Sequence, residues 1–153
     1  MVEIILVIEY FLAKSIPKTQ RAITNLKLQK LLYYAQGFFM ASNNNDMLFR
    51  DELQAWVHGP VCHEVYTRYK EYGFNEIPKS NDEVILPEEV TKVLDRVWNV
   101  FGSYNGSQLE YLTHRESPWI KARNGLKPWE ISNNPIDPEE IRHYFQSKLG
   151  GGN

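Results

Sequence analysis

The chain of 153 residues contains one cysteine, Cys62, and lacks any long uninterrupted hydrophobic run. A single thiol cannot form an internal disulfide, which fits a reducing compartment. The apolar N-terminal stretch, residues 2–12, has no positively charged start and contains Glu3 and Glu9. It is also far shorter than the ~18 apolar residues that indicate a membrane-spanning helix. We therefore predict a cytoplasmic protein with no secretion signal and no membrane contact.

The chain also lacks an excess of basic charge, since its formal net charge is −2 and its isoelectric point is near 6.1. No global positive field is available to hold nucleic acid, so we do not expect a nucleic-acid partner. Basic residues gather in two places, Lys14, Lys18, Arg21, Lys27 and Lys30, and then Lys121, Arg123 and Lys127. We interpret both groups as solvated faces, with weak phosphate contacts as the alternative.

The usual signatures of catalysis and of cofactor binding are missing as well. The glycines do not follow the spacing of a phosphate-binding or dinucleotide-binding loop. His58, Cys62 and His63 lie close together in sequence, but a zinc site normally needs a second pair of ligands elsewhere. Cys62 is expected at a helix start, where the dipole would lower its pKa, yet no protease signature surrounds it. We predict no enzyme activity, no metal and no cofactor, with thiol catalysis and zinc as minor alternatives.

The length and composition are those of one globular domain, which we place at residues 1–149. The last four residues, 150–153, are expected to be a disordered tail. The nine tyrosines and four tryptophans make the chain rich in aromatic residues. Most of these side chains are expected in the core, and the rest are candidates for a protein interface, where Tyr and Trp are enriched.

The most informative segment begins near Thr24 or Asn25, either of which could cap a helix. Large apolar residues then recur at steps of three and four, which places them on one helical face: Leu28, Leu31, Leu32, Ala35, Phe38 and Phe39. Leu26, Tyr33 and Met40 form a second apolar stripe. A helix that is apolar on most of its circumference is expected at the centre of a domain. Its polar positions, chiefly Lys27, Gln29, Lys30 and Gln36, leave narrow strips for water or a partner.

A small β element should follow this central helix. After the turn at residues 43–46, the apolar run 47–49 and the alternating run 53–58 predict a two-stranded hairpin. Gly59 and Pro60 are expected to end the second strand. Pro60 would then open a helix that continues to Tyr72 and stops at Gly73.

The remaining segments predict further helices and little else. Residues 2–14 could form a helix or a strand, because the segment is rich in β-branched residues. Residues 15–23 form a connector, and 74–86 a polar loop in which only 84–86 could add a short strand. A helix from Pro87 should end near 105–106, and start signals at Ser107, at 117–118 and at 137–138 predict three more. The fold class is therefore mainly α, a compact single domain around a central buried helix with a small β-hairpin.

The segments 26–37, 48–49 and 53–61, together with Tyr66, resemble the Panacea domain of the SocA-like antitoxins in residue type and in order. The later segment 112–119 is similar to the C-terminal threonine-histidine and proline-tryptophan signature of that family. The resemblance assigns structural roles to Leu28, Leu31, Leu32, Gly59, Pro60, Val61, Thr113, His114, Pro118 and Trp119. It also favours a helix over a strand at residues 2–14.

The resemblance implies a protein without enzyme activity, the antitoxin of a type II toxin–antitoxin pair, which binds and neutralises a cognate toxin. The alternative is a phage- or host-encoded adaptor that delivers a partner to a protease or another machine. On either hypothesis we expect partner contacts at Gln29, Tyr33, Gln36, Trp56, His58 and Tyr66. The hairpin corner has a purely structural interpretation of equal weight, and an apolar outer side of the first helix could support a homodimer.

Overall fold

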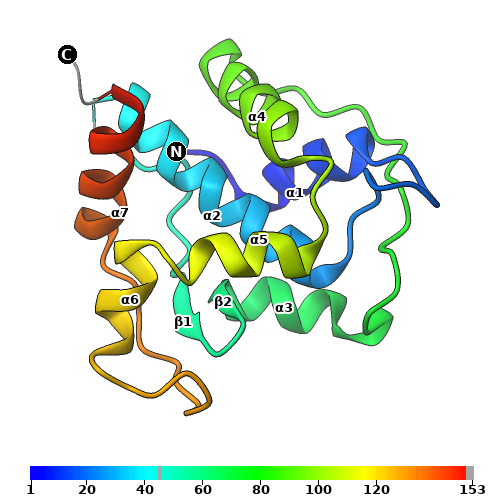
Figure 1. Ribbon diagram of the computed structural model, residues 1–153. Coiled ribbons are helices and arrows are strands. Elements are labelled where there is room, and N and C mark those ends of the chain that lie inside the picture. Colours follow the sequence, from blue (N-terminus) through cyan, green and yellow to red (C-terminus); the bar gives the residue numbers. More distant parts are fainter. Residues whose placement is uncertain (45, 151–153) are drawn as a thin grey trace.

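The computed structural model describes residues 1–44 and 46–150 of the chain. The fold is mainly α, as predicted, with short helices arranged around one long helix and a single two-stranded hairpin among the described residues (Figure 1). Of the predicted tail, residues 151–153 lie outside the described residues, whereas Gly150 ends a π-helix, Gln146–Gly150. No helix in the described ranges has the length and apolar character needed to cross a membrane.

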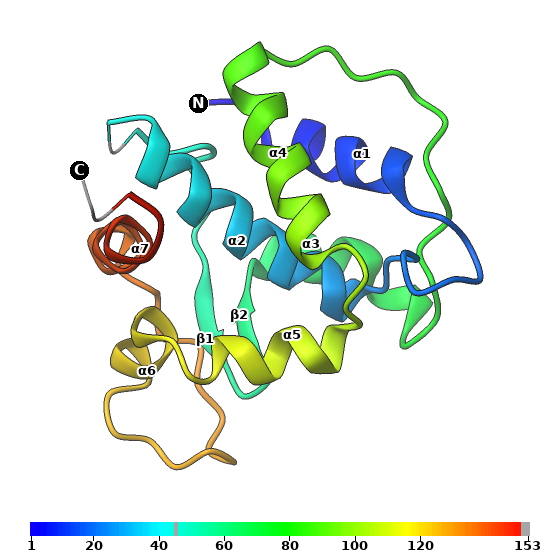
Figure 2. The ribbon, with the colours of Figure 1, turned by 45° about the horizontal axis from the view of Figure 1, so that its top comes forward.

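The long central helix is α2, Asn25–Ser42, and the side chain of Thr24 caps it by accepting a hydrogen bond from the Lys27 N–H at 3.2 Å. It packs against α1, α3, α4, α5, α7 and the hairpin, so nearly its whole circumference is buried. Figure 2 shows it passing between α4 and α7. The predicted central position of this helix is therefore confirmed.

The polar positions of α2 do not face water, which corrects the expectation of solvated strips. Lys27 and Lys30 are both buried, and their amino groups donate to backbone carbonyls that lie far away in sequence. The Lys27 Nζ is 2.6 Å from the carbonyl oxygen of Gly102. Because backbone carbonyls satisfy these amines, neither lysine is available for phosphate contacts.

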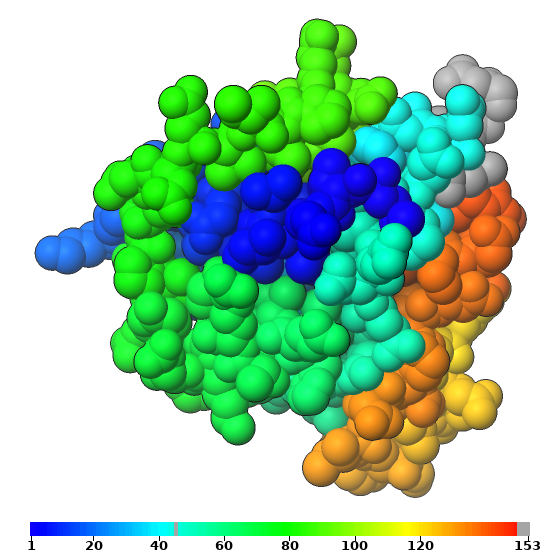
Figure 3. Space-filling view, turned by 180° about the vertical axis from the view of Figure 1, so that it is seen from behind, coloured from blue at the N-terminus to red at the C-terminus, as the bar shows by residue number. Residues whose placement is uncertain are grey.

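The N-terminal helix α1, Ile4–Lys14, packs against α4, Glu88–Phe101. Tyr10 donates a hydrogen bond to the carboxylate of Asp95 at 2.6 Å, and Lys14 pairs with the same carboxylate at 3.0 Å. From behind, α1 fills the space between α4 and the segment that contains α3 (Figure 3). The expectation of a helix here, and not a strand, is confirmed.

The hairpin differs from the prediction in its position. Strand β1, Gln54–Trp56, pairs with β2, Gly59–Val61, and residues 57–58 form the turn. Residues 47–49 are not a strand, and Gly59 and Pro60 belong to the second strand and do not end it. Pro60 lies opposite Ala55, whose N–H bonds outside the hairpin, so a proline without an N–H is tolerated at this position.

Helix α3, His63–Tyr69, therefore begins after Cys62 and not at Pro60, and a 3-10 turn, Lys70–Tyr72, extends it to Gly73. The outer edge of β1 receives the segment before α7, because the Ala55 N–H donates to the Asn134 carbonyl at 2.8 Å. Residues 84–86 form no strand. The hairpin thus lies between α2 and the C-terminal part of the chain.

Three short helices complete the fold. Helix α5, Gly106–Thr113, is capped by Asn105, which forms a reciprocal capping box with Gln108, and not by Ser107 as expected. Helix α6, Ser117–Arg123, has Glu116 at its N-cap position, so Ser117 is its first residue and not its cap. Helix α7, Pro138–Phe145, begins as predicted, with the Asp137 carboxylate accepting from the Glu139 N–H at 2.9 Å.

Candidate functional site

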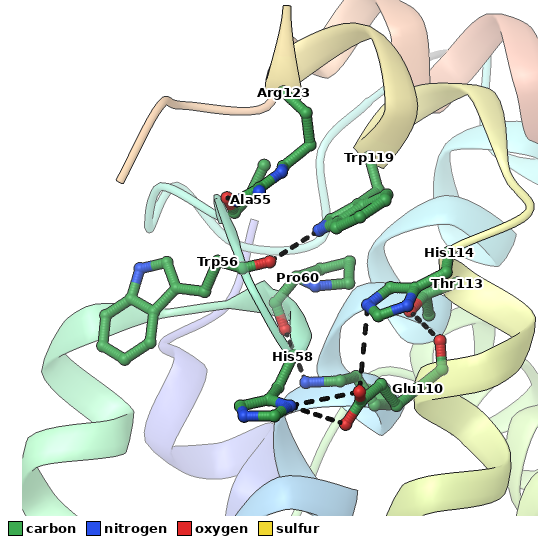
Figure 4. Close-up of polar contacts among 10 residues, drawn as sticks. Ala55, Trp56, His58, Pro60, Glu110, Thr113, His114, Trp119 and Arg123 are labelled. Carbon is green, nitrogen blue, oxygen red and sulfur yellow. Dashed lines mark hydrogen bonds and ion pairs between the residues drawn. The ribbon is translucent and has the colours of Figure 1, made fainter. Parts of the chain in front are cut away.

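The two sequence signatures of the chain meet at the hairpin. In Figure 4, the hairpin faces the end of α5 and the start of α6, which carry Thr113, His114 and Trp119. The indole Nε1 of Trp119 donates to the carbonyl oxygen of Trp56 at 2.8 Å. This bond joins residues that are 63 positions apart in sequence, and it holds the hairpin against α6.

Arg123, one turn after Trp119 on α6, completes this contact, although the sequence pattern predicted a solvated cation at this position. It is buried, and its guanidinium donates to the carbonyl of Ala55 at 3.3 Å. The same group donates to the carbonyls of Lys127 at 2.8 Å and Glu130 at 2.7 Å. The sequence signal for this buried position is the spacing of four residues between Trp119 and Arg123. Residues at this spacing share one face of a helix.

A glycine is required at position 59, the first residue of strand β2. Its φ is +103°, a conformation that favours glycine. A Cβ at this position would lie 2.7 Å from Cε of Lys30 and 2.8 Å from Oγ1 of Thr113. The strand thus approaches α2 and α5 so closely that only a hydrogen atom fits between them.

The close approach places the buried amine of Lys30 next to the second strand. Its Nζ donates to the carbonyl oxygen of Pro60 at 3.1 Å. Burial lowers the pKa of Lys30 to about 7, and the nearby Glu110 carboxylate opposes this effect. Lys30 therefore anchors β2 to the central helix and does not carry a permanent surface charge.

Glu110 joins two histidines at the edge of the site. Nδ1 of His58 lies 3.1 Å from Oε2 and 3.2 Å from Oε1 of Glu110, and Nε2 of His114 lies 4.0 Å from Oε2 (Figure 4). The His114 ring stacks on Trp119 with 4.2 Å between ring centroids. Burial lowers the pKa of His114, which favours the neutral ring in this stack.

The cysteine and the histidines of this region were the candidates for a metal site or a reactive thiol. Within residues 1–44 and 46–150, no cluster of three or more His, Cys, Asp or Glu side chains could hold a metal ion. Cys62 is buried, and burial raises the pKa of its thiol, in contrast to the lowering expected at a helix start. Desolvation of the thiolate outweighs the hydrogen bonds from the first backbone N–H groups of α3.

Three of the residues expected to contact a partner lie inside the domain. The side chains of Gln29, Tyr33 and Gln36 are buried and hydrogen-bonded within the chain. Gln29 accepts from the Cys62 N–H at 2.9 Å, and Gln36 accepts from the Leu48 N–H at 2.7 Å. These amides therefore fix the segments on either side of the hairpin to α2.

The other three expected contact residues reach the surface at two different places. Trp56 and Tyr66 are partly exposed, and their ring centroids are 5.1 Å apart. His58, with 71% of its side chain exposed, lies in the turn next to Glu110, whereas the Trp56 ring points away from it (Figure 4). The alternation of side chains predicted for residues 53–58 stops before His58, because strand β1 ends at Trp56.

Trp56, His63 and Tyr66 form a small aromatic patch, in which His63 is exposed and the other two rings are partly exposed. The centroids of Trp56 and His63 are 5.8 Å apart, and the indole Nε1 of Trp56 donates to the Gln54 side chain at 2.8 Å. The backbone carbonyl of Trp56 is held by Trp119 at the same time. The patch is therefore a partly exposed aromatic surface on a rigidly held backbone.

A site of this kind, with buried polar groups that serve the fold and an exposed aromatic surface, is typical of a binding domain. The chain matches the family described as Antitoxin SocA-like, Panacea domain, over residues 28–120, and it belongs to that family. It is 29% identical over 116 residues to Antitoxin SocA of Caulobacter vibrioides (strain NA1000 / CB15N). That alignment covers 67% of this chain and 61% of the relative's length. No solved structure matches the chain.

The family match contains nearly all of the site. It begins at Leu28 on α2, includes the hairpin and α5, and ends at Ile120 on α6. Arg123 and α7 follow it, although both contribute buried side chains to the same domain. The family assignment therefore gives an antitoxin domain whose fold is completed by the C-terminal part of this chain.

Proposed function

We propose that this protein is the antitoxin of a type II toxin–antitoxin pair and that it neutralises its cognate toxin by direct binding in the cytoplasm. The observation that supports this proposal is the aromatic patch formed by Trp56 of the hairpin with His63 and Tyr66 of α3. Tyrosine and tryptophan side chains dominate the binding energy of many protein interfaces. A patch on a backbone that is already rigid loses little conformational entropy on binding, which favours affinity.

The proposal explains why so many motif residues are buried. Trp119 and Arg123 hold the first strand, and Lys30 holds the second. Together these groups position Trp56. On this proposal, the family motif maintains the binding surface, and the toxin contacts the exposed rings.

The test is a growth assay with the neighbouring gene, expressed alone and together with this protein. We expect the neighbouring gene product to arrest growth, and co-expression to restore growth with a stable complex on co-purification. Trp56→Ala should weaken the complex by about tenfold or more, as for an interface hot spot. Because Trp56 is partly exposed and its indole Nε1 donates to the side chain of Gln54, this variant is expected to fold.

The matched control is Trp129→Ala, since Trp129 is 71% exposed and lies in the loop between α6 and α7. This variant should bind the toxin as the wild type does. Rescue of growth without a complex would contradict direct neutralisation and support the adaptor hypothesis. Equal losses in the two tryptophan variants would contradict the assignment of the hairpin patch.

A further inference from the structure

A second surface of the molecule combines apolar and charged groups in a groove between α4 and α7, which we call the α4–α7 groove. Figure 2 shows the two helices on either side of α2. The groove has a volume of about 320 Å³, and aromatic side chains of α2 and α4, among them Tyr34, Phe38 and Phe101, form its floor. Tyr34 and Phe101 are stacked with 4.0 Å between centroids. This floor offers apolar contact to a side chain inserted from outside.

Two cations border the groove, Arg96 from α4 and Lys148 from the π-helix after α7. Arg96 lies over the ring of Phe38 at 5.3 Å, and Lys148 lies over the ring of Tyr144 at 5.7 Å. Within the described part of the chain, neither cation forms an ion pair with a carboxylate. By contrast, Lys92, one turn before Arg96, pairs with Glu88 at 3.3 Å. The charges at the groove are thus available to a partner.

The one carboxylate that lines the groove does not neutralise these cations fully. Glu116 accepts hydrogen bonds from the hydroxyls of Tyr33 and Tyr34, each at 2.9 Å. Burial raises the pKa of Glu116 to about 7, against the opposing effects of both hydroxyls and of Lys148. At neutral pH the negative charge of Glu116 is therefore only partly present, so it offsets the charges of Arg96 and Lys148 only in part.

We propose that the α4–α7 groove binds a segment of the toxin in which a large apolar side chain stands next to an aspartate or glutamate. The apolar side chain contacts the aromatic floor, and the carboxylate pairs with Arg96 and Lys148. A volume of this size is at the lower end of ligand-binding pockets and suits one side chain. This inference depends on the proposed function, because the partner is the toxin, and it adds a second contact with a stated chemistry.

The first test is charge reversal, with binding to the purified toxin measured at low and high salt. The variant Arg96→Glu with Lys148→Glu should weaken binding by about tenfold, because carboxylates then face a carboxylate. The control Lys70→Glu with Lys92→Glu makes the same change in net charge on exposed residues outside the groove. It should bind within about threefold of the wild type, and salt should weaken the wild type more than the groove variant.

The second test identifies the bound segment. Val100 is 47% exposed at the groove, so Val100→benzoylphenylalanine places a photo-cross-linker there without disturbing the core. The toxin peptide attached after irradiation should contain an acidic residue beside a large apolar one. A cross-link to a second copy of this chain, to nucleic acid or to a toxin peptide without an acidic residue would overturn the inference.

The outcomes separate this inference from the function on which it depends. If the wild type binds the toxin and the groove variant binds equally well, the groove inference is wrong and the antitoxin function remains. If the wild type forms no complex with the toxin, both are wrong. If the groove variant and the Lys70/Lys92 control lose the same affinity, net charge explains the effect and the groove inference fails.

Discussion

The ring of Phe145 in α7 occupies the space that a side chain at position 37 of α2 would need. A Cβ built on Gly37 would lie 2.6 Å from Cγ of Phe145, and the ring carbons Cδ2 and Cε2 would be closer still. Gly37 therefore permits α7 to dock directly on the backbone of the central helix. The same ring packs edge-on against Tyr33 and Tyr34, with centroids 5.5 and 6.0 Å away.

Gly37→Ala should destabilise the protein by about 2 kcal/mol, because overpacking a core forces side chains and backbone to shift. Phe145→Ala should cost about 4 kcal/mol through the cavity it leaves. The double variant should lose less stability than the two single variants together, since the alanine methyl then fills part of that cavity. Urea unfolding of all four proteins gives the coupling energy, and simple additivity would contradict the contact.

Gly59→Ala should destabilise by about 3 kcal/mol or more, because the new methyl group meets Lys30 and Thr113 and the backbone is strained at positive φ. Gly125→Ala is the control, since φ is +80° there and nothing lies within 4 Å of the new Cβ. We expect a cost of about 1 kcal/mol for Gly125→Ala. Thermal unfolding measures both, and equal costs would show that the packing around Gly59 is looser than described.

Trp119→Phe removes the N–H that bonds to the Trp56 carbonyl and leaves that acceptor without its partner. The expected loss is about 1–2 kcal/mol, with faster hydrogen exchange at the hairpin amides. The control Trp129→Phe, at an exposed position, should change stability by less than about 0.5 kcal/mol. Unchanged exchange at the hairpin in Trp119→Phe would mean that other contacts suffice to hold β1.

Glu116 makes stability depend on pH. Its pKa is about 7 in the folded protein and near 4.5 when unfolded, so the folded state binds the proton more tightly. The stabilising contribution is complete below pH ~4.5 and is lost as the pH rises through about 7. At 1.36 kcal/mol per pKa unit, this loss is at most about 3 kcal/mol.

Glu116→Gln tests this directly, because the amide can still bond to the tyrosine hydroxyls but does not ionise. Unfolding free energies of the wild type and of Glu116→Gln should be compared between pH 5 and 8. The stability of the wild type relative to the variant should fall over this range. Parallel curves for the two proteins would show that the Glu116 carboxyl titrates at its ordinary value.

Local patterns predicted which segments are helical, although the start of α3 and the caps of α5 and α6 were predicted wrongly. The steps of three and four in residues 28–39 placed α2 at the centre, and Asp137 followed by Pro138 placed the start of α7. Helix position and helix start depend on residues that are close together in the sequence. Local patterns are therefore sufficient to predict them. The resemblance to the Panacea domain also led to the family to which the chain belongs.

The sequence did not predict the hairpin register or the buried polar side chains. Gln29, Lys30 and Gln36 look like solvent positions of a helix, but their partners are backbone groups at Cys62, Pro60 and Leu48. Hydrogen bonds between residues that are far apart in sequence produce no periodic sequence pattern. The same applies to Gly59 and Pro60, whose usual role as strand breakers is overridden by contacts with α2 and α5.

The dependence of the hairpin on Trp119 and Arg123 has a consequence for the newly synthesised chain. Residues 54–61 leave the ribosome long before α6, yet several of their hydrogen-bond partners lie in α6 and in the segment before α7. Contacts of such long sequence separation form late in folding. An unfinished chain therefore lacks the contacts that hold the hairpin, and the hairpin reaches its final position only after the segment before α7 has been synthesised.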